Sequence, residues 1–514
     1  MTRNTVIAAI SNLSTAYNLV VINLVQVFVQ NQYCGGDHCH DAVVVASTSC
    51  LVGAIVGQLC MGYVGDCLGR ARALQLTMAL SILGALTSAF VRPLDGSKPS
   101  SIFYSLAIAR FFLGVGVGGV YPLSATIASE SADSAKSRGR TASIVFSMQG
   151  VGNLVVPLIA LVLVAIFGNP PNLDDKGPED PGLTWRFALG IGALPGILLA
   201  PFKAAETSKR VPIRSSLQTT LVPGAGGSRG VDSAAVVVVP TDAPSQHQGA
   251  ASSSSPEASS LDKADPSTAS PRLTLWEALQ QRAYWGKLIG CAGGWFLFDI
   301  TFYGNQLFQA RVLVLIFASN STDAPIPIAG DVHSNRALQM LIIAAIGLPG
   351  YYVSCYLMDS WGRRIIQLQG FFFMGLTFGI MGLALQPLEH VPFLLMLLYG
   401  LTFFFSNFGP NATTFILPAE TFPAHLRSTL NGFCAASGKL GATLGSACFV
   451  PLKRAVGLGN TMVACAVVSF LGLVVTFAFV EDRRGKDMEG DSNQLLGSSD
   501  NSNGNSHAAA TLDQ

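Results

Sequence analysis

Three polar residues within one apolar segment could bind an anion. Trp295, Asp299 and Tyr303 are each four residues apart, so on a helix an indole N–H, a carboxyl and a phenol project from one face. A carboxyl inside a bilayer is costly unless it lines a cavity or has a partner. The arrangement therefore predicts a binding site. The alternative is that the rings lie at the lipid interface and that Asp299 is near the end of the segment.

Lys439 supplies a cation within another apolar segment. Its ammonium needs an anionic partner, which could be Asp299 or an anionic substrate. Tyr121, Gln149 and Asn411 add neutral hydrogen-bonding groups from further segments. Neutral donors around one ammonium suit a tetrahedral oxyanion, because its oxygens accept many hydrogen bonds. A purely structural salt bridge between the lysine and the aspartate is the alternative.

A charged loop motif occurs twice between apolar segments and indicates an internal duplication. Its residues are Gly62, Asp66, Gly69 and Arg70 in the first copy and Asp359, Gly362, Arg363 and Arg364 in the second. If each loop joins two helices at the membrane surface, its aspartate can pair with a neighbouring helix and gate the site. We predict the same gating role for charged residues at the ends of other apolar segments: Glu130, Arg138, Glu420 and Arg427. Two copies in equivalent positions favour a duplicated transporter over a chance turn.

The elements that must position these residues are membrane-spanning helices. The chain has 514 residues, of which 50% are hydrophobic and 12% are charged, a composition unlike that of an ordinary soluble globule. Spans of about 20 mostly apolar residues are expected for helices that cross a bilayer. They can be placed at 5–29, 42–64, 73–91, 101–121, 141–167, 186–202, 285–309, 337–358, 365–386, 392–417, 429–451 and 460–480.

The predicted fold is an all-α membrane protein with twelve transmembrane helices in two pseudo-symmetric six-helix bundles. The N-terminal bundle covers residues 1–203, and the C-terminal bundle covers residues 284–480. Residues 204–283 are rich in Ser, Ala and Pro, which predicts a disordered cytoplasmic linker. Residues 481–514 have a similar composition and predict a disordered cytoplasmic tail.

The charges indicate the orientation of the chain and exclude one class of partner. The net charge is only +1, so there is no basic field for nucleic acid. Lys and Arg residues in alternate short loops, Arg70 and Arg363 among them, place those loops, the linker and both termini in the cytoplasm.

Two of the ten cysteines lie in the first loop on the opposite side. Cys34 and Cys39 could form a disulfide or, with the neighbouring histidines, a metal clip. We favour the disulfide, because no partner ligands are evident elsewhere. The other eight cysteines lie in or beside spans, where a thiol is usually a small packing residue.

Several strings around these residues are similar to one family. They are Tyr121-Pro-Leu-Ser-Ala-Thr-Ile127, Phe146-Ser-Met-Gln-Gly150, Trp295 to Tyr303, Asn407-Phe-Gly-Pro-Asn-Ala-Thr-Thr-Phe415, Arg427-Ser-Thr429 and Ala436-Ser-Gly-Lys-Leu-Gly441. The chain resembles the phosphate:proton symporter family of the major facilitator superfamily, typified by fungal and plant high-affinity phosphate permeases. The resemblance implies a plasma-membrane transporter of inorganic phosphate. Phosphate would contact Tyr121, Gln149, Trp295, Asp299, Tyr303 and Asn411, with Lys439 balancing its charge.

The chain departs from that family at the residues that usually carry protons in the first half. The family typically has aspartates where this chain has Thr15, Asn18 and Val120, and a histidine where it has Asn431. None of these four side chains exchanges a proton near neutral pH. Phosphate would therefore be moved by alternating access with altered coupling. The protein would be a facilitator, an exporter, or a symporter that uses Asp299, Glu130 or a sodium site.

Other functions have weaker support in the sequence. No nucleotide-binding loop and no hydrolase constellation is evident, so neither an enzyme nor an ATP-driven pump is indicated, and no cofactor or metal is required. A transporter of another anion or small solute is one alternative. A phosphate sensor that binds without net transport is another, since the family's aspartates are missing.

Overall fold

The computed structural model describes residues 2–34, 39–132, 134, 137–167, 182–199, 275–306, 309 and 332–482. The regular elements within these ranges are helices, with these bounds: α1 Arg3–Val20, α2 Ile22–Cys34, α3 His40–Leu68, α4 Arg70–Ala89, α5 Ser101–Glu130, α6 Arg138–Phe167, α7 Leu183–Ile191, α9 Leu275–Gln280, α10 Arg282–Leu288, the π-helix η3 Ile289–Gly293, α11 Gly294–Gln306, α13 Val332–Trp361, α14 Arg363–Leu383, α15 Leu385–Glu389, α16 Pro392–Asn407, α17 Pro410–Thr421 and α18 Arg427–Phe479. The linker predicted over 204–283 lies outside the described residues up to 274, and the tail predicted over 481–514 lies outside them from 483. Residues 275–283 are described and contain α9 and the start of α10, so the prediction of disorder is wrong there.

The helices have the length and composition of membrane spans. Eight helical segments of the described chain are long and apolar enough to cross a bilayer. Helices α1 and α2 are joined end to end, as are α10, η3 and α11, while α18 contains two helices that meet at Gly457. The division of α18 makes nine segments of these eight. Helices α4 and α7 and the joined segment of α10, η3 and α11 match the other three of the twelve predicted segments. The predicted all-α membrane fold is confirmed.

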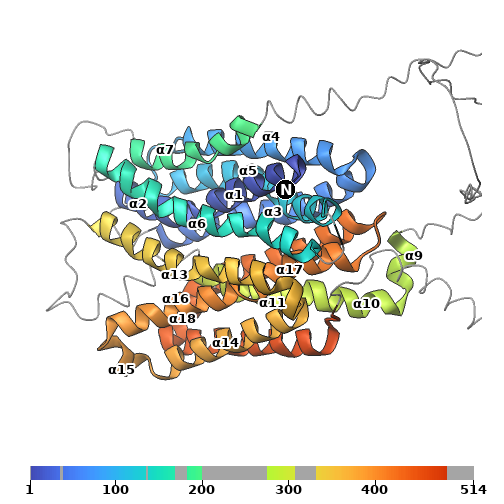
Figure 1. Cartoon of the computed structure of the whole chain (residues 1–514). Coiled ribbons are helices and arrows are strands. Elements are labelled where there is room, and N and C mark those ends of the chain that lie inside the picture. The colour runs from blue at the N-terminus through green and yellow to red at the C-terminus, as the bar shows by residue number, and fades with distance from the viewer. Residues whose placement is uncertain are drawn as a thin grey trace, which may run out of the picture.

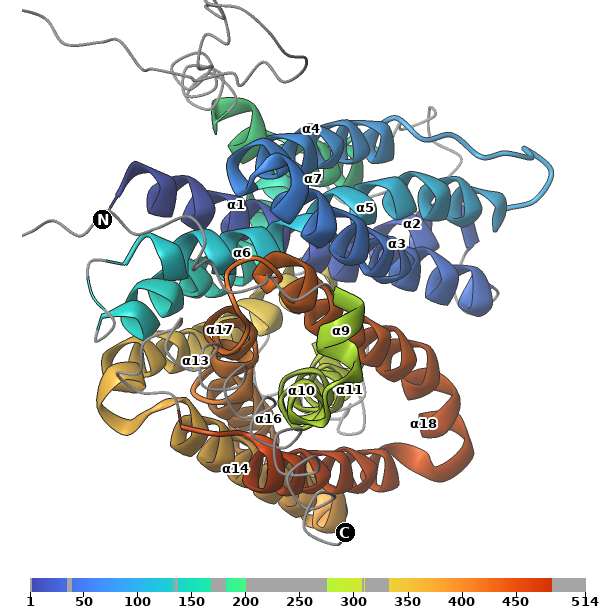
Figure 2. The ribbon, with the colours of Figure 1, turned by 90° about the vertical axis from the view of Figure 1, so that its right-hand side faces the viewer.

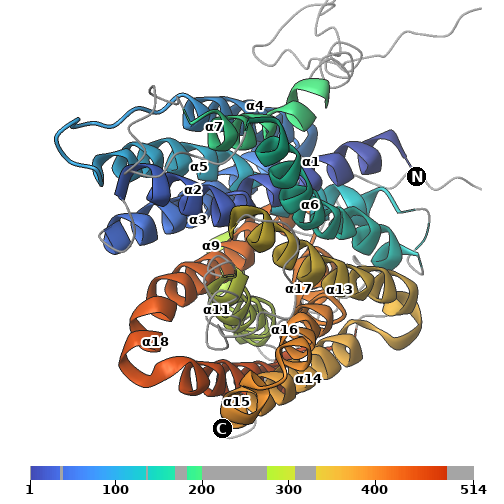
Figure 3. The same cartoon turned by 90° about the vertical axis from the view of Figure 1, so that its left-hand side faces the viewer.

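The helices form two bundles that lie side by side. The N-terminal bundle contains α1 to α7 and the C-terminal bundle α10 to α18, shown as blue-to-green and yellow-to-red layers in Figure 1. Figures 2 and 3 look along the helices from opposite ends. The bundles meet chiefly where α3 packs against α18 and where α6 packs against α13. The space between these two contacts is where a central site can form.

Two helices differ from their predicted spans for local reasons. Helix α5 continues past Tyr121 through Pro122 to Glu130. Two of its added polar residues are satisfied there: the Ser124 hydroxyl accepts from Asn12 of α1, and the Thr126 hydroxyl donates to the Pro122 carbonyl. The span predicted over 392–417 is broken between α16 and α17, where Pro410 has no N–H to continue the helix.

Both copies of the repeated motif turn sharply at a glycine. Gly69 and Gly362 have φ angles of 89° and 86°, in the region where only glycine is unstrained. The next residue begins a new helix, α4 or α14. We call the end of the molecule that carries these turns the motif end.

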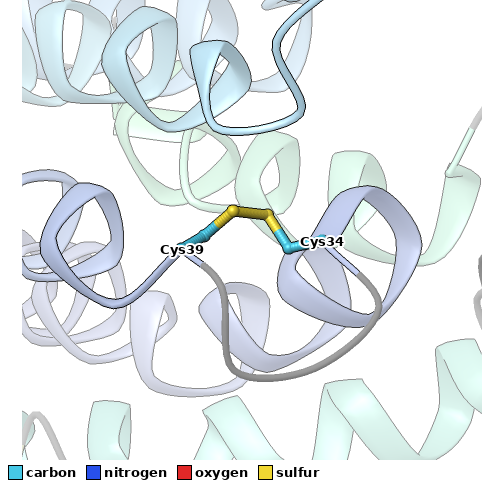
Figure 4. Close-up of a disulfide and its surroundings, with 2 residues drawn as sticks. All are labelled: Cys34 and Cys39. Carbon is cyan, nitrogen blue, oxygen red and sulfur yellow. A yellow bond between two sulfur atoms is a disulfide. The ribbon is translucent and has the colours of Figure 1, made fainter.

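A disulfide closes the opposite end of the N-terminal bundle. Cys34 at the end of α2 is bonded to Cys39 just before α3 (Figure 4). The predicted disulfide is confirmed, and neither thiol is available as a metal ligand. We call this the disulfide end.

Glycines allow the helices of the N-terminal bundle to approach closely. A Cβ added at Gly114 of α5 would lie 2.2 Å from the Cys50 carbonyl oxygen of α3. One at Gly118 would lie 2.4 Å from the Ala54 oxygen. Small residues at such crossings permit backbone contact between membrane helices.

We expect Gly114→Ala to destabilise the protein by about 1–3 kcal/mol, because the methyl group meets backbone that cannot rotate away. Thermal unfolding of the purified protein in detergent measures the change. Gly96→Ala is the matched control, since an added Cβ there meets nothing within 4 Å. Equal unfolding temperatures for the two variants would contradict this account of the α3–α5 contact.

Candidate functional site

A buried ion pair stands at the centre of the molecule. The Lys439 ammonium of α18 lies 2.8 Å from the Asp299 carboxylate of α11, and the two side chains are 2% and 1% exposed. The same nitrogen lies 4.1 Å from the ring centre of Tyr303 and 5.2 Å from that of Tyr121. Asp299 and Tyr303 belong to the same half as Lys439, whereas Tyr121 belongs to the N-terminal bundle, so the lysine contacts the other half through the Tyr121 ring.

A series of small residues on α18 positions this pair. A Cβ at Gly438 would lie 2.4 Å from the Trp295 indole, so the ring lies directly on the helix backbone. Gly441 and Gly445 similarly admit the backbone of α11, at the carbonyls of Phe296 and Ile300. The close α11–α18 crossing places Lys439 opposite Asp299, one turn from Trp295.

An aromatic layer lies next to the ion pair. Phe146 of α6 stacks on Phe415 of α17 with ring centres 4.5 Å apart. Tyr121 meets Phe415 edge-on at 6.3 Å, and Tyr351 of α13 lies 5.9 Å from Phe146. Both halves contribute rings to this layer, so a movement of one bundle against the other must rearrange it.

Two buried polar atoms of this region have no partner. The Tyr121 hydroxyl and the Gln149 carbonyl oxygen make no hydrogen bond of good geometry, although both side chains are buried and Tyr121 has Tyr303 as a polar neighbour. Buried polar groups are usually satisfied, and an orphan at a candidate site indicates a place for a ligand or water. Asn411 differs, because its amide donates to the Tyr351 hydroxyl at 2.9 Å and to the Asn407 side chain at 2.8 Å.

The structure thus brings together most of the residues predicted to bind substrate. Lys439, Asp299, Tyr303 and Tyr121 form one cluster, with Trp295 packed beside Lys439 on Gly438. Gln149 and Asn411 are each one helical turn from the stacked rings of the aromatic layer. Their direct contact with a substrate stays a prediction.

The sequence analysis missed two polar residues of this region. The Tyr351 hydroxyl and the Asn407 side-chain oxygen each accept a hydrogen bond from the Asn411 amide. The Asn407 amide in turn donates to the Gly347 carbonyl of α13, the helix that carries Tyr351. Both also line a cavity between the halves that extends toward the disulfide end, with Asn153 and Gln306. A search for polar residues inside the apolar segments of the second half would have found them.

Charged residues link the two halves at the motif end. Glu130 lies 3.1 Å from Arg70 and 3.0 Å from Arg427 of α18. Asp66 accepts hydrogen bonds from the backbone N–H and the hydroxyl of Thr429, at 2.7 and 2.8 Å. Backbone packing adds to this contact, since a Cβ at Gly62 would lie 2.6 Å from the Ser428 oxygen. The motif end is closed in this conformation.

The second copy of the motif makes a related but less symmetric arrangement. Arg363 pairs with Glu420 through two hydrogen bonds of 2.7 and 2.8 Å, within the C-terminal half. Asp359 lies 3.3 Å from Arg363 and accepts from the backbone N–H of Arg140 in the other half, at 3.1 Å.

Two residues predicted to gate have other surroundings. Arg364 donates to the Phe477 carbonyl and lies over the Phe477 ring, which ties α14 to α18 within one half. Arg138 forms no ion pair with the rest of the described chain, although it is within electrostatic range of Arg427. Their gating roles stay predictions.

Comparison with known proteins places the chain in a family. The Major Facilitator Superfamily profile matches residues 9–446. The inorganic phosphate transporter 1-6 of Oryza sativa subsp. japonica is 36% identical over 473 residues, covering 85% of this chain and 81% of the relative. The probable inorganic phosphate transporter 1-6 of Arabidopsis thaliana is 34% identical over 452 residues, with the same coverage.

The chain belongs to the inorganic phosphate transporter family of the major facilitator superfamily. The resemblance seen in the sequence is confirmed. The crystallised proton:xylose symporter XylE, bound to 6-bromo-6-deoxy-D-glucose, matches 95% of this chain and 97% of its own, with a TM-score of 0.63 at 16% identity. At that identity the match shows the shared fold of the superfamily. The chain is a multi-pass membrane protein of this transporter superfamily.

Neutralising one partner of the central ion pair should cost more than neutralising both. Lys439→Met or Asp299→Asn alone leaves a buried charge unpaired, and we expect each to lower the free energy of unfolding by about 3–5 kcal/mol. The double variant should lie within about 1 kcal/mol of the wild type. Thermal unfolding in detergent measures all three. Arg454→Gln, on an exposed residue, is the control, and additive losses in the double variant would refute the pairing.

Glu130→Gln should open the motif end more often. The change removes the anion shared by Arg70, which is 28% exposed, and Arg427, which is 2% exposed. A buried guanidinium left without its carboxylate favours the open, hydrated state, so the open population should rise at least several-fold. Spin labels at Arg72 and His425, in a background whose exposed cysteines are replaced by serine, report the distance across this end. Asp95→Asn, on the exposed loop at the disulfide end, should leave the distribution unchanged. The same distances in Glu130→Gln and wild type would contradict the gating role.

Proposed function

We propose that this protein moves inorganic phosphate across a membrane by alternating access. The observation that carries the proposal is the buried Lys439 ammonium, surrounded by Asp299, Tyr303 and Tyr121 from both halves. An ammonium with neighbouring phenol, amide and indole donors can replace much of the water around a tetrahedral oxyanion. The relatives named as phosphate transporters support phosphate as that anion.

The unpartnered atoms support the same site. The Tyr121 hydroxyl can donate to a phosphate oxygen. The side-chain amide oxygen of Gln149 has no hydrogen-bond partner. A 180° rotation of this amide would present its NH2 group, which carries two donors, to an anion. We infer that phosphate binds beside Lys439 between Tyr121, Gln149 and Tyr303, with Trp295 and Asn411 completing the site from the second half.

Asn411 requires a rearrangement before it can contact phosphate. Both of its amide donors are engaged by Tyr351 and Asn407 in the conformation with a closed motif end. These three residues belong to α13, α16 and α17 of the C-terminal half. We propose that phosphate binding releases Asn411 from Asn407, which would couple substrate to the rearrangement of the aromatic layer.

The ends of the molecule fit the two gates of an alternating-access cycle. The motif end is held shut by the Glu130 and Asp66 contacts, while the cavity beside Tyr351 lies toward the disulfide end. We infer that the motif end faces the cytoplasm, together with both termini and the linker, and that the membrane is the plasma membrane. A disulfide at the other end suits an oxidising exterior.

We infer that phosphate transport is not coupled to protons through Thr15, Asn18 or Val120, the positions where the family typically has aspartates. Moving one negative charge inward against 100 mV costs about 2.3 kcal/mol, and phosphate carries about one to two charges near pH 7. Asn18 donates its amide to the carbonyls of Ser14 and Gly192, which an ionised carboxylate cannot do. Uptake would need protons or sodium at other groups such as Asp299 or Glu130, whereas a facilitator or exporter would need neither.

Phosphate binding should require the charge of Lys439 even when folding does not. We expect the Lys439→Met/Asp299→Asn double variant to bind phosphate at least about tenfold more weakly than wild type, because it keeps the fold but loses the cation. Titration calorimetry with inorganic phosphate measures the affinity, and competition by sulfate and a hexose tests the substrate class. Retained affinity in the double variant would reduce the pair to a structural salt bridge.

Flux in reconstituted vesicles tests transport itself. We expect labelled phosphate to cross membranes that contain the protein, at a rate that Glu130→Gln and the double variant change and that Arg454→Gln leaves unchanged. Imposed proton and sodium gradients are the arms that reveal coupling. Phosphate binding without flux would overturn the transport proposal in favour of a sensor.

A further inference from the structure

The cavity beside Tyr351 has a polar lining that the proposed phosphate site does not include. This lining consists of a phenol and several amides: Tyr351 of α13, Asn153 of α6, Gln306 of α11, Asn407 of α16 and Gln309. Asn153 belongs to the N-terminal half and the other four belong to the C-terminal half, so the cavity lies between the halves. None of the described residues that line it carries a charge. We call it the amide cavity.

Two helices carry both a residue of the proposed phosphate site and, about one turn nearer the disulfide end, an amide of this cavity. On α6 these residues are Gln149 and Asn153, and on α11 they are Tyr303 and Gln306. Spacings of three or four residues place both side chains on one helical face, about 5 Å apart along the axis. The amide cavity therefore repeats the neutral groups of the phosphate site one turn further out, without its cation.

Unpartnered hydrogen-bonding groups of both kinds lie at the amide cavity. The side-chain oxygens of Asn153 and Gln306 have no hydrogen-bond partner, and Gln306 is only 4% exposed. The Tyr351 hydroxyl accepts from Asn411 at 2.9 Å, and within the described chain its own proton has no acceptor. Buried polar groups are usually satisfied, so free acceptors beside a free donor indicate a place for a ligand that both donates and accepts.

The lining suits a singly charged, protonated oxyanion. Dihydrogen phosphate carries P–OH groups that can donate to amide oxygens and P–O groups that can accept from amide and phenol donors. Sulfate has no O–H group near neutral pH. The cost of removing an ion from water also grows with the square of its charge, and no cation in the described lining offsets that cost. A neutral cavity therefore disfavours a dianion.

We propose that the amide cavity is an outer site that captures phosphate as the monoanion H₂PO₄⁻ before the ion reaches Lys439, and that it rejects divalent oxyanions. The inference rests on the proposed phosphate transport. In the present conformation the cavity has room for about two or three water molecules. Because its lining comes from both halves, separation of the halves at the disulfide end widens it for phosphate.

The contacts of Asn411 connect the outer site to the central one. Tyr351 lines the amide cavity and also belongs to the aromatic layer, 5.9 Å from Phe146. Asn407 lines the same cavity and accepts from Asn411 at 2.8 Å. An ion held by the Tyr351 hydroxyl is therefore next to Asn411. As the ion moves inward, the Asn411 amide exchanges the Asn407 oxygen for a phosphate oxygen.

Removing the amides should weaken capture and leave later steps intact. Gln306→Met and Asn153→Leu replace each amide by an apolar side chain of similar size. We expect each to lower kcat/KM for uptake of labelled phosphate into reconstituted vesicles by about tenfold, through a higher KM with little change in kcat. Met340→Leu is the matched control, because Met340 lines the same cavity without a polar group. Wild-type kcat/KM in both amide variants would overturn the outer site.

An added cation tests the selection by charge. Asn153 is only half-buried, so Asn153→Lys places an ammonium at the cavity without enclosing it. A positive charge attracts a dianion about twice as strongly as a monoanion, and we expect sulfate to inhibit phosphate uptake at least about tenfold more strongly than in the wild type. Thermal unfolding in detergent checks that the variant is folded. Inhibition by sulfate that is equal in the two proteins would overturn the selection by charge.

The failure of this inference is distinguishable from the failure of the proposed function. The absence of phosphate uptake by the wild-type protein would overturn the proposed function and the outer site with it. Wild-type uptake together with amide variants that behave like Met340→Leu would overturn the outer site alone.

Discussion

The buried contact between Lys439 and Asp299 is the interaction on which the central region depends. Two opposite charges at this depth are tolerated only because each is the other's partner. Their approach requires α11 and α18 to cross with almost no side chain between them, which explains the glycines at 438, 441 and 445. The cation then faces Tyr121 across the boundary between the halves. The close crossing of α11 and α18, the pairing of Lys439 with Asp299 and the position of the candidate site therefore depend on one another.

The requirement that a buried charge have a partner has different consequences elsewhere in the molecule. At the motif end Glu130 and Arg70 are partly exposed, whereas Arg427 is buried, so water can reach the anion that pairs with a buried guanidinium. This is a suitable property for a gate. Arg110 is also buried, and among the described residues it has no carboxylate partner, so its charge cannot separate into water at modest cost.

The family relationship and the departures from it are compatible. The chain carries the aromatic and amide groups that we assign to phosphate, and it has Thr15, Asn18 and Val120 where the sequence resemblance led us to expect acidic groups. Asn18 is integrated into its surroundings through two donated hydrogen bonds, so the amide is built into the contact between α1 and the Gly192 region. The second half contributes the Lys439–Asp299 ion pair at the candidate site.

Much of this protein could be predicted from the sequence because its strongest signals are local. Apolar length predicts the helices, the four-residue spacing predicts the shared face of Trp295, Asp299 and Tyr303, and the repeated glycine predicts the turns at 69 and 362. The ends of α5 and the break before Pro410 were less predictable, because partners on other helices decide whether polar residues can extend a span.

Pairing between distant segments was decided only by the tertiary structure. The sequence by itself determined which residues must be buried and which of them carry charge, since composition and periodicity fix that in a bilayer. It did not determine that Asn411 donates to Tyr351, that Arg364 ties two helices of one half, or that Arg110 has no acidic partner among the described residues. Those facts depend on which side chains meet between helices that are about 60 to 110 residues apart in the sequence. The energetic cost of a buried charge depends on these neighbours, which the sequence alone does not give.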